Sequence, residues 1–458
     1  MKIQTNFCVA YIPIGVGTFH LESAQKLFLE SQKIIRELSQ AQQIDFAFPE
    51  KMLLSLDDLG EWLNELERSK KEYLLLLQNV TFANAAYATE VFRRFKDSSV
   101  TIWTLREPVI DGGRLRLNSL TGAFSAANAF CSIQEGSFEY IFGSPDEKEV
   151  QAQLKTIFLA AKVKSQLRAC KLAAVGHTPD GFGFGRALDS DLSRVFGTRL
   201  ISVEARELIL KAKKYSPQEI EDVLQKSKKI LVNLDSIPEQ NVLDFARLYK
   251  AYTEFVEQNK IAALASRCWP DFFVDFGTPV CAVLSLLNMD GIPSSCESDL
   301  YGALSMLITE LLGGEGAFFG DPVSLDEKEN TLTFWHCGMA NCSLARSDTG
   351  ANVGVHPNRK IGPTMEFGCK PSSQATIFRV GRTKDGAFRF FISEGEILDK
   401  PRQFLGTSLV VKTKTPSKTL VKNAVLDGWE PHFVVAYKNI SEELCALARM
   451  LRVPFYKY

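Results

Sequence analysis

The run YLLLL at Tyr73–Leu77 decides the fold class of the N-terminal part of this 458-residue chain. A continuous apolar run of this length is typical of a central parallel strand that is buried on both faces of its sheet. Helical spacing of apolar residues is found before it at Leu21–Ser39 and after it at Ala83–Phe95, and Phe7–Ile12 and Val100–Thr104 have the pattern of further strands. This alternation predicts a doubly wound open α/β domain.

Three domains are expected along the chain. The first α/β domain covers residues 1–168, and a second α/β domain at residues 169–330 begins with the strand Lys171–Val175. After residue 330 the pattern changes to short β segments, such as Thr376–Val380, which are separated by Gly and Asn turns. This change predicts a mostly β C-terminal domain at residues 331–458 that closes with a helix.

The composition is that of a soluble globular protein and argues against nucleic acid as the main partner and against a membrane protein. Hydrophobic residues make up 45% of the chain and charged residues 23%, and 53 Lys and Arg against 54 Asp and Glu leave a net charge of -1. Nucleic-acid-binding proteins usually carry a clear basic excess. The longest apolar runs are shorter than the roughly 18 to 20 residues of a membrane-crossing helix, and no signal peptide is recognisable. With ten scattered cysteines and no CxxC pair, we expect a cytoplasmic protein with reduced thiols.

Two acidic residues are candidates for chemistry. Glu297, in the segment CESD, follows serines that can cap a helix, and is expected in the first helical turn. A carboxylate there can also serve only to complement the helix dipole. Asp321 ends the apolar segment FFGD and is expected at the carboxyl end of a buried strand, which is the edge where open α/β sheets bind ligands. An Asp before Pro can equally form a simple turn.

Two histidines accompany these acids. His336 ends the predicted strand Thr331–Trp335, and His432 lies in the segment WEPH just before an apolar strand. Taken singly, each histidine is equally well explained as a core or turn residue. Two carboxylates with one or two imidazoles form a mixed oxygen and nitrogen set that suits Mn²⁺ or a related divalent ion. Spacing in the sequence does not show whether the four side chains converge.

The order of these motifs resembles that of the L-fucose/L-arabinose isomerase superfamily. The resemblance is strong over about residues 260–440 and general over the first domain. It rests on the segments Arg267-Cys268-Trp269-Pro270, Cys281, Gly291–Asp299, Gly320-Asp321, His336-Cys337-Gly338, Ala375–Arg379, Glu394-Gly395-Glu396 and Trp429–His432. The resemblance implies an L-fucose isomerase-like fold and a metal-dependent aldose–ketose isomerase.

The resemblance also implies roles for individual residues. Glu297, Asp321 and His432 are similar to the metal ligands of the family, with Mn²⁺ as the expected ion and Co²⁺ or Mg²⁺ as alternatives. His336 resembles a histidine that some members use as a further ligand and others leave beside the site. Many relatives carry a second histidine where this chain has Pro431, which leaves the site one proton-transfer or sugar-binding group short.

The implied reaction moves a proton between C2 and C1 of an open-chain sugar. An ion that holds O1 and O2 would stabilise the enediolate, while Glu297 and Asp321 exchange the proton as general base and acid. The substrate is expected to be a hexose, a deoxyhexose or a pentose. A sulfonated 6-deoxyhexose of the sulfoquinovose type is an open alternative that would require a cation in the site.

Further substrate contacts are expected from Trp269 and His336, and from residues of the first domain. In the family, that domain helps to close the site of a neighbouring subunit, so His20, Trp103 and the loop with Arg114 and Arg116 are candidates here. The family resemblance implies a homo-oligomer, commonly a hexamer. Arg114, Arg116, Arg379 and Arg382 are each able to meet an anionic sugar, or to be solvated surface arginines.

Two other functions remain open from the sequence. A metal-dependent hydrolase would use the same carboxylates to activate water, and a non-catalytic sugar-binding protein would share the α/β architecture. Nucleotide binding is weakly indicated, because the Gly repeats at Gly15–Gly17 and Gly181–Gly185 do not complete the dinucleotide fingerprint.

Overall fold

The chain folds into two compact units, each described here by itself. The computed structural model describes residue 3 and residues 5–134, 136–314 and 316–458. The N-terminal unit consists of Gln4–Gln166 with Glu442–Arg452, and the C-terminal unit mainly of Leu167–Ser441 with Val453–Tyr458. The C-terminal unit combines the second predicted domain with most of the third, whose closing helix belongs to the N-terminal unit, and the division at residue 330 stays a prediction.

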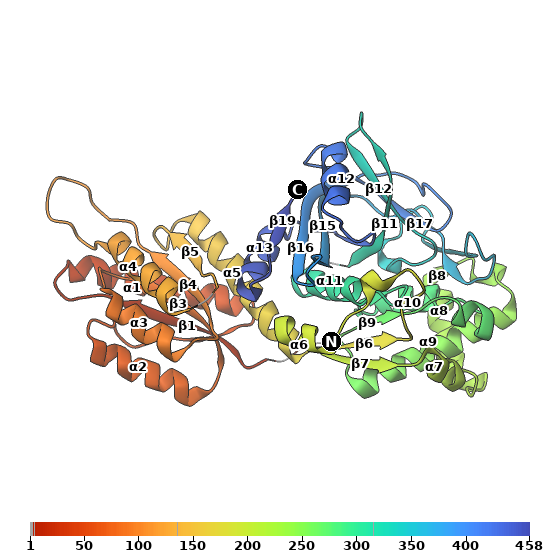
Figure 1. The fold of residues 1–458 in the computed structure, drawn as a ribbon, viewed down its shortest axis with the longest axis horizontal. Helices are drawn as coiled ribbons and strands as arrows, with labels where there is room; N and C mark the ends of the chain where they lie inside the picture. Colours follow the sequence, from red (N-terminus) through yellow and green to blue (C-terminus); the bar gives the residue numbers. More distant parts are fainter. Residues whose placement is uncertain (1–2, 4, 135, 315) are drawn as a thin grey trace. The chain divides into compact units, whose positions relative to one another are not determined.

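The N-terminal unit is a doubly wound α/β fold around a parallel sheet with strand order β2-β1-β3-β4-β5 (Figure 1). Its strands are β1 Phe7–Ile14, β2 Asp45–Ala47, β3 Glu72–Asn79, β4 Ser99–Thr104 and β5 Glu139–Phe142. Its helices are α1 Leu21–Ala41, α2 Leu56–Ser69, α3 Ala85–Arg94, α4 Ser119–Ile133, α5 Lys148–Ala169 and, from the end of the chain, α13 Ser441–Leu451.

The leucine run explains why both faces of this sheet are covered. Leu74 and Leu76 pack with α1 and α5, whereas Leu75 and Leu77 pack with α2, α3 and α4 on the opposite face. Successive side chains of a strand point to opposite faces, so a continuous apolar strand requires helices on both sides. The predicted fold class is confirmed for this part of the chain.

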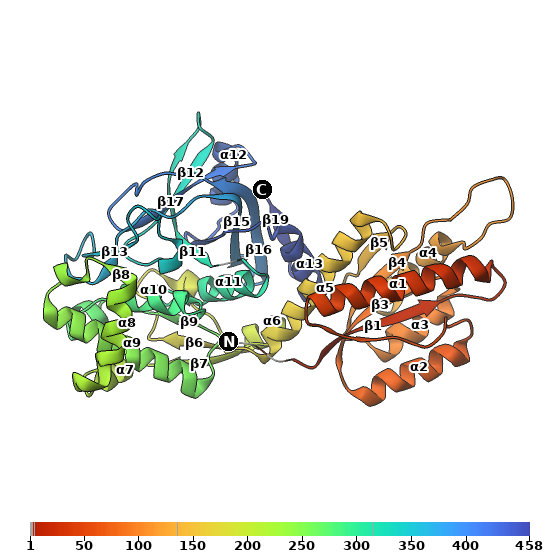
Figure 2. The same cartoon turned by 180° about the vertical axis from the view of Figure 1, so that it is seen from behind.

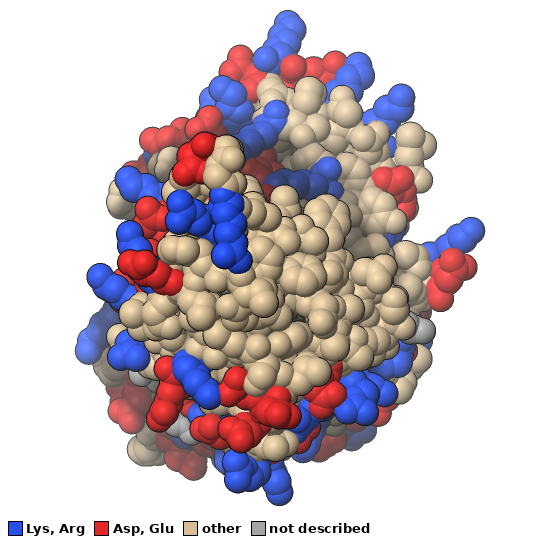
Figure 3. Space-filling model, turned by 90° about the vertical axis from the view of Figure 1, so that its left-hand side faces the viewer, with Lys and Arg blue, Asp and Glu red and all other residues tan. Residues whose placement is uncertain are grey.

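The surface of the molecule seen from the side of the N-terminal unit is uncharged over a broad central area, with charged side chains around it (Figure 3). Exposed apolar side chains of this unit include Ile110, Leu115, Leu120 and Phe124, which lie in the loop after β4 and on α4. No helix in the described part of the chain is both long and apolar enough to cross a membrane.

The C-terminal unit begins with a second parallel sheet, of strand order β10-β9-β6-β7. Its strands are β6 Lys171–Val175, β7 Arg199–Val203, β9 Ala263–Ser266 and β10 Ser294–Ser295. The helices of this part are α6 Asp189–Phe196, α7 Ala205–Ala212, α8 Glu221–Ile230, α9 Glu239–Asn259, α10 Cys281–Met289 and α11 Leu300–Leu311.

The rest of the C-terminal unit is a β-barrel, as the predicted mostly β segment requires. Its strands follow the order β15-β18-β11-β12-β17-β16, and a pairing of β15 with β16 closes the barrel. The strands are β11 Ala317–Asp326, β12 Thr331–His336, β15 Ser372–Arg382, β16 Phe388–Ile397, β17 Thr407–Thr413 and β18 Phe433–Ala436, and β19 Phe455–Lys457 adds to β16. The remaining elements are α12 Ser417–Leu426 and a small sheet of β8 Leu231–Val232, β13 Ala351–Gly354 and β14 Thr364–Met365.

Helix α11 joins the two sheets of the C-terminal unit into one structure. Ten of its twelve residues are buried, because it contacts β9 of the parallel sheet and β11, β15 and β18 of the barrel (Figure 2). A helix that is apolar all round belongs inside a domain rather than on its surface. The residues that lead into α11 are therefore held where the parallel sheet meets the barrel.

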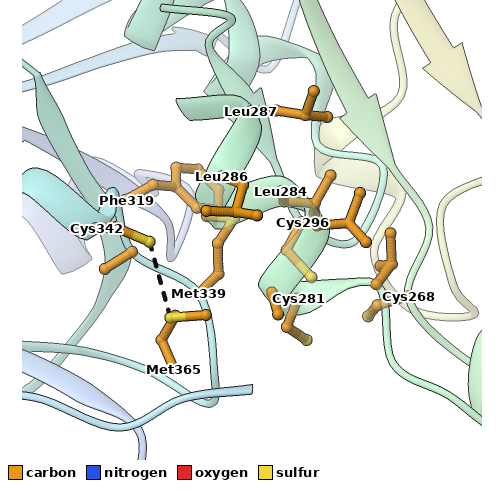
Figure 4. Close-up of a cluster of buried hydrophobic side chains, with 14 of the residues drawn as sticks. Cys268, Cys281, Leu284, Leu286, Leu287, Cys296, Phe319, Met339, Cys342 and Met365 are labelled. Carbon is orange, nitrogen blue, oxygen red and sulfur yellow. Dashed lines mark hydrogen bonds between the residues drawn. The ribbon is translucent and has the colours of Figure 1, made fainter. Parts of the chain in front are cut away.

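Around α10 lies a core of sulfur-containing and aliphatic side chains (Figure 4). The pKa of the Cys296 thiol is raised well above its usual value by hydrogen bonds with Cys268 and Cys281 and by burial. Such thiols stay protonated and behave as small apolar side chains. The cysteines of this core, Cys268, Cys281, Cys296 and Cys342, are free thiols.

Candidate active site

Glu297 lies in the connection between β10 and α11, and its predicted position in the first helical turn is wrong. The helix begins at Leu300, and Asp299 is its N-cap, accepting a hydrogen bond from the Gly302 amide at 2.9 Å. Glu297 and the following Ser298 have φ angles of 57° and 53°. Two consecutive non-glycine residues in the left-handed region cost of order 1 to 3 kcal/mol each. Strain of this kind is typical of functional sites, because it aims a side chain in a direction that a regular helix does not allow.

Asp321 lies within β11, so its predicted position at the end of a strand is also wrong. Strand β11 continues to Asp326 and belongs to the antiparallel barrel, where Asp321 is opposite Trp335 of β12. A side chain on the neighbouring Gly320 would place Cβ 2.4 Å from the Trp335 carbonyl oxygen, so the two strands can approach only because this residue is glycine. On the other side, Gly320 is in register with Phe433 of β18, which brings Asp321 next to His432.

His432 is the centre on which the acids converge. Its Nε2 lies 3.1 Å from Oε2 of Glu297 and 3.4 Å from Oδ1 of Asp321. Two oxygens that close to one nitrogen are also close to each other. The His432 side chain is only 4% exposed, whereas those of Glu297 and Asp321 are 20% and 36% exposed. The imidazole therefore belongs to the floor of the site, and the two acids are open to a ligand.

Asp299 sets the orientation of His432. Its Oδ2 lies 2.9 Å from Nδ1 of the imidazole, and its two oxygens accept hydrogen bonds from Arg379 at 2.5 and 3.0 Å. Asp299 and Arg379 are fully buried. Arg379 thus holds the carboxylate, and the carboxylate holds the Nδ1 proton, so that Nε2 faces Glu297 and Asp321. A carboxylate behind a ligating histidine fixes both the tautomer and the angle of the ring.

The electrostatics of the cluster follow from this arrangement. Burial acts to raise the pKa of Asp299, but Arg379 and His432 hold it well below its usual value. Burial raises the pKa of Asp321 to about 6, with the nearby Glu297 adding to the shift against the opposing effect of His432. Burial would lower the pKa of His432, yet its bonds to Asp299 and Glu297 raise it to about 9. Without a bound ion, His432 is therefore protonated at neutral pH, and its Nε2 proton lies between the carboxylates of Glu297 and Asp321.

These residues fit a divalent cation. Two donors bound side by side to one ion at ~2.1 Å are roughly 3 Å apart, close to the separations of His432 Nε2 from the two acids. With His432 neutral, Glu297, Asp299 and Asp321 carry three negative charges against the one positive charge of Arg379, an excess that a divalent ion would balance. His432 contacts both acids directly, and among the described residues no group of three or more His, Cys, Asp or Glu side chains is placed so that it could hold a metal ion as it stands.

His336, at the end of β12, is oriented differently from His432. Its Nδ1 accepts hydrogen bonds from the amides of Gly338 and Met339 at 3.1 and 2.9 Å. Burial, with the charge of His432, lowers the pKa of His336 to about 3, so the ring is neutral. A neutral imidazole that accepts at Nδ1 carries its proton on Nε2. His336 is therefore a hydrogen-bond donor in this structure, which favours the predicted substrate contact over metal ligation.

A substitution at His336 can test the role of Nε2 separately from that of Nδ1. Because an Asn oxygen takes the place of Nδ1, we expect His336→Asn to keep the backbone hydrogen bonds and to remove only the Nε2 donor. KM for the expected sugar substrate should rise about 10- to 100-fold, as expected for one lost hydrogen bond, and binding of the expected Mn²⁺, measured by elemental analysis, should be unchanged. Loss of the bound metal in this variant would instead identify His336 as a ligand.

Aromatic side chains surround His432. The loop Gly181–Arg186 places Phe182 and Phe184 with ring centroids 6.4 and 5.2 Å from the imidazole, and Phe319 lies 4.9 Å away. A side chain on Gly185 would place Cβ 2.7 Å from Cα of Asp299, so only glycine lets this loop lie so close. The predicted substrate contact Trp269 packs edge-on against Phe182 at 6.3 Å. The Gly-Phe repeat thus forms an apolar wall of the site rather than a nucleotide-binding loop.

The other predicted contacts belong to the N-terminal unit, which is not placed relative to this cluster. His20 caps helix α1 through Nδ1, Arg114 donates to the carbonyl of Thr18, and Arg116 lies 3.9 Å from Asp111. Trp103 is fully buried in β4 and donates to the Gly143 carbonyl at 2.9 Å. The expectation that Trp103 meets a substrate is therefore wrong, because it is a core residue.

Sequence reasoning missed the residues that orient the site. Asp299 was visible in the segment CESD, but nothing in the sequence distinguishes a helix cap that also holds a distant histidine. Arg379 was expected to meet a sugar or solvent, whereas it is buried against Asp299. Arg382 is paired with Asp191 at 2.9 Å. The sequence signal that could have distinguished Arg379 from Arg382 is the alternation along β15. Residues three positions apart on a strand point to opposite faces of the sheet, so only one of the two arginines can face the interior.

A large apolar cavity of about 460 Å³ lies beside the cluster rather than in it. It is lined by α12 and by strands β11, β12 and β18, with Leu332, Phe391 and Leu420 among its residues. Glu430 is its one acidic residue, so it offers no acid pair. The chemistry of the unit lies with the polar cluster around His432.

Comparisons with known proteins agree with the order of the motifs. A family described as "L-fucose isomerase, C-terminal domain" matches residues 359–458. A sulfoquinovose isomerase from Clostridium sp. (strain MSTE9) is 55% identical over 450 residues, which cover 98% of this chain and 99% of the relative. Sulfoquinovose isomerases from Priestia aryabhattai and Alkalicoccus urumqiensis are 37% and 34% identical, and the matches cover 97 to 98% of each chain.

Proposed function

This chain belongs to the sulfoquinovose isomerases within the L-fucose/L-arabinose isomerase superfamily and is an aldose–ketose isomerase, and we propose that it converts sulfoquinovose into the corresponding 6-sulfonated ketose. Family membership decides against the hydrolase and the non-catalytic sugar-binding protein. The observation that carries the proposal in the structure is the pair of partly exposed acids, Glu297 and Asp321, which face one oriented imidazole.

Glu297 and Asp321 are the residues that we assign to proton transfer. In the aldose-to-ketose direction one carboxylate removes the proton from C2, a proton is delivered to C1, and the hydroxyl proton of O2 passes to O1. Carboxylates suit this exchange because they can bind a metal ion and also accept and return a proton. The reverse reaction uses the same two groups in opposite roles.

The remaining residues hold this pair in place. His432, oriented by Asp299 and Arg379, keeps its Nε2 toward the two acids, and Phe182 and Phe184 shield it from water. A divalent ion held by Glu297, Asp321 and His432 would supply Lewis-acid stabilisation of the charge that develops on the sugar oxygens. We propose Mn²⁺ for this role, with Co²⁺ or Mg²⁺ as alternatives.

Removal and restoration of the metal test this proposal. We expect the protein stripped with a chelator to lose at least about 100-fold in ketose formation from sulfoquinovose, because the developing oxyanion would be left without its counter-charge. Addition of Mn²⁺, Co²⁺ or Mg²⁺ in parallel should restore turnover, and NMR of the sugar identifies the ketose. Unchanged activity after complete stripping, measured by elemental analysis, would contradict the metal role. Absence of the ketose with every ion would contradict the substrate.

We also propose a cytoplasmic homo-oligomer. The family resemblance implies a hexamer in which the first domain of one copy helps to close the site of the next. The exposed apolar residues Ile110 and Phe124 of the N-terminal unit support a contact with another copy, since apolar patches ringed by polar residues commonly mark interfaces. In this assembly His20, Arg114 and Arg116 would complete the substrate contacts.

A further inference from the structure

Arg359 lies on an aromatic surface next to the candidate active site. Its Cζ is 5.3 Å from the ring centroid of Trp269 and 4.9 Å from that of Phe273. A guanidinium held against aromatic faces keeps its charge and its hydrogen-bond donors, while the rings restrict its orientation. We call Arg359, Trp269 and Phe273 the arginine shelf.

The backbone beneath the shelf is fixed by His356. This histidine lies in the connection between β13 and β14, and its Nδ1 accepts hydrogen bonds from the amides of Asn358 and Arg359 at 3.2 and 3.3 Å. The His356 carbonyl accepts a further bond from Lys360 at 2.9 Å. His356 itself is buried and packs edge-on against Phe273 at 5.0 Å. The position of Arg359 is therefore determined before any ligand binds.

The charge of Arg359 is not neutralised. No described carboxylate forms an ion pair or a hydrogen bond with its side chain, whereas Arg379 is paired with Asp299 and Arg382 with Asp191. A partly buried arginine without an acidic partner can bind an anion from solution. The bound anion then neutralises the charge of the guanidinium.

The shelf belongs to the surroundings of the acid pair. Trp269 contacts Phe182, and Phe182 contacts His432, which links the shelf to the imidazole through two ring contacts. Electrostatics agree with this placement. Burial and the charge of Arg359 lower the pKa of His356 to about 4, while Glu297 acts in the opposite direction.

We propose that Arg359 binds the sulfonate of the substrate and determines the preference for a sulfonated sugar. The inference rests on the proposed function. A sulfonate keeps one negative charge at every physiological pH and offers three acceptor oxygens, which match the planar pair of donors on a guanidinium. With C1 and C2 at the acid pair, the sulfonate at the far end of the sugar meets the cation at the edge of the site.

Arg186 is the competing cation near Phe184. It also lacks a carboxylate partner among the described residues, but its side chain is exposed and donates to Thr178 Oγ1 at 3.2 Å. A solvated guanidinium on a flexible side chain gives up more entropy and hydration when it binds an anion. The structure therefore favours Arg359.

Four variants test the assignment: Arg359→Gln, Arg359→Lys, the control Lys360→Gln and the competing Arg186→Gln. For Arg359→Gln we expect kcat/KM for sulfoquinovose to fall about 100-fold, the loss expected for a charge-assisted contact, mainly through KM. Since the acid pair is untouched, kcat at saturating substrate should stay within about threefold. Competitive inhibition by inorganic sulfate should weaken in parallel. The matched control Lys360→Gln removes the same charge from the adjacent, exposed residue and should leave both constants unchanged. Arg359→Lys, which keeps the charge, should recover part of the loss.

The outcomes are separable. If the wild-type protein forms no ketose from sulfoquinovose, the proposed function fails. If the wild type is active and Arg359→Gln keeps its KM, only the sulfonate assignment is overturned. A loss confined to Arg186→Gln would move the sulfonate to the other cation and overturn it as well. If Arg359→Gln does not fold, an unchanged KM and sulfate inhibition in Arg359→Lys would count against the assignment, because a lysine cannot reproduce the paired donors.

Discussion

Glu297→Gln is expected to lower kcat for ketose formation by about 10³- to 10⁴-fold, the range seen when a general base is removed. The amide has nearly the same shape as the carboxylate but cannot accept the proton from the sugar. It also takes one negative charge from the cluster around His432, so metal affinity should fall in the same variant. Steady-state kinetics at saturating Mn²⁺, together with elemental analysis, separates the loss of the base from the loss of the ion.

The control for this experiment lies on the helix that follows Glu297. Glu310, at the far end of α11, is exposed, and Glu310→Gln should leave kcat within about twofold. Circular dichroism and the melting temperature of both variants should match those of the wild type, because Glu297 is partly open and its loss buries no unpaired group. A Glu297→Gln protein that keeps near-normal turnover would contradict the assignment of this residue as a base.

Arg379→Met is expected to lower the free energy of unfolding of the C-terminal unit by about 3 to 5 kcal/mol, the cost of leaving one member of a buried ion pair without its partner. Asp299 would keep its hydrogen bonds with Gly302 and His432 but lose its contact with the Arg379 guanidinium. Activity should fall as well, because the carboxylate that orients His432 would no longer be held. Denaturant unfolding followed by fluorescence measures the change in stability.

Arg382→Met is the matched control, on the same strand. Its pair with Asp191 has side chains 23% and 19% exposed, against 0% and 1% for Arg379 and Asp299. Partly solvated ion pairs contribute about 0 to 1 kcal/mol. The free energy of unfolding of the control should therefore fall by at most about 1 kcal/mol. The double variant Asp299→Leu with Arg379→Met should recover part of the loss, since no unpaired charge is then buried. Equal destabilisation by the two arginine substitutions would contradict the role given to burial.

The sequence alone was sufficient for the fold class, and it singled out three residues, Glu297, Asp321 and His432, that the structure brings together. The leucine run at Tyr73–Leu77 predicted a doubly covered sheet because burial on both faces is a local property of a strand. The order of motifs through Glu297, Asp321 and His432 identified the superfamily. The local patterns predicted the wrong secondary-structure position for both acids. Glu297 has a left-handed backbone in front of the helix, and Asp321 lies inside a strand that continues into the barrel.

Only the tertiary structure decided which atoms meet. Asp299 and Arg379 are 80 residues apart, and Asp299 and His432 are 133 apart, so no periodicity relates them. Their contact depends on the barrel strands β15 and β18 packing against α11. The shelf of Arg359 on Trp269 likewise joins two distant segments. Secondary structure follows from short-range spacing, whereas the orientation of an imidazole or the freedom of one arginine depends on long-range packing.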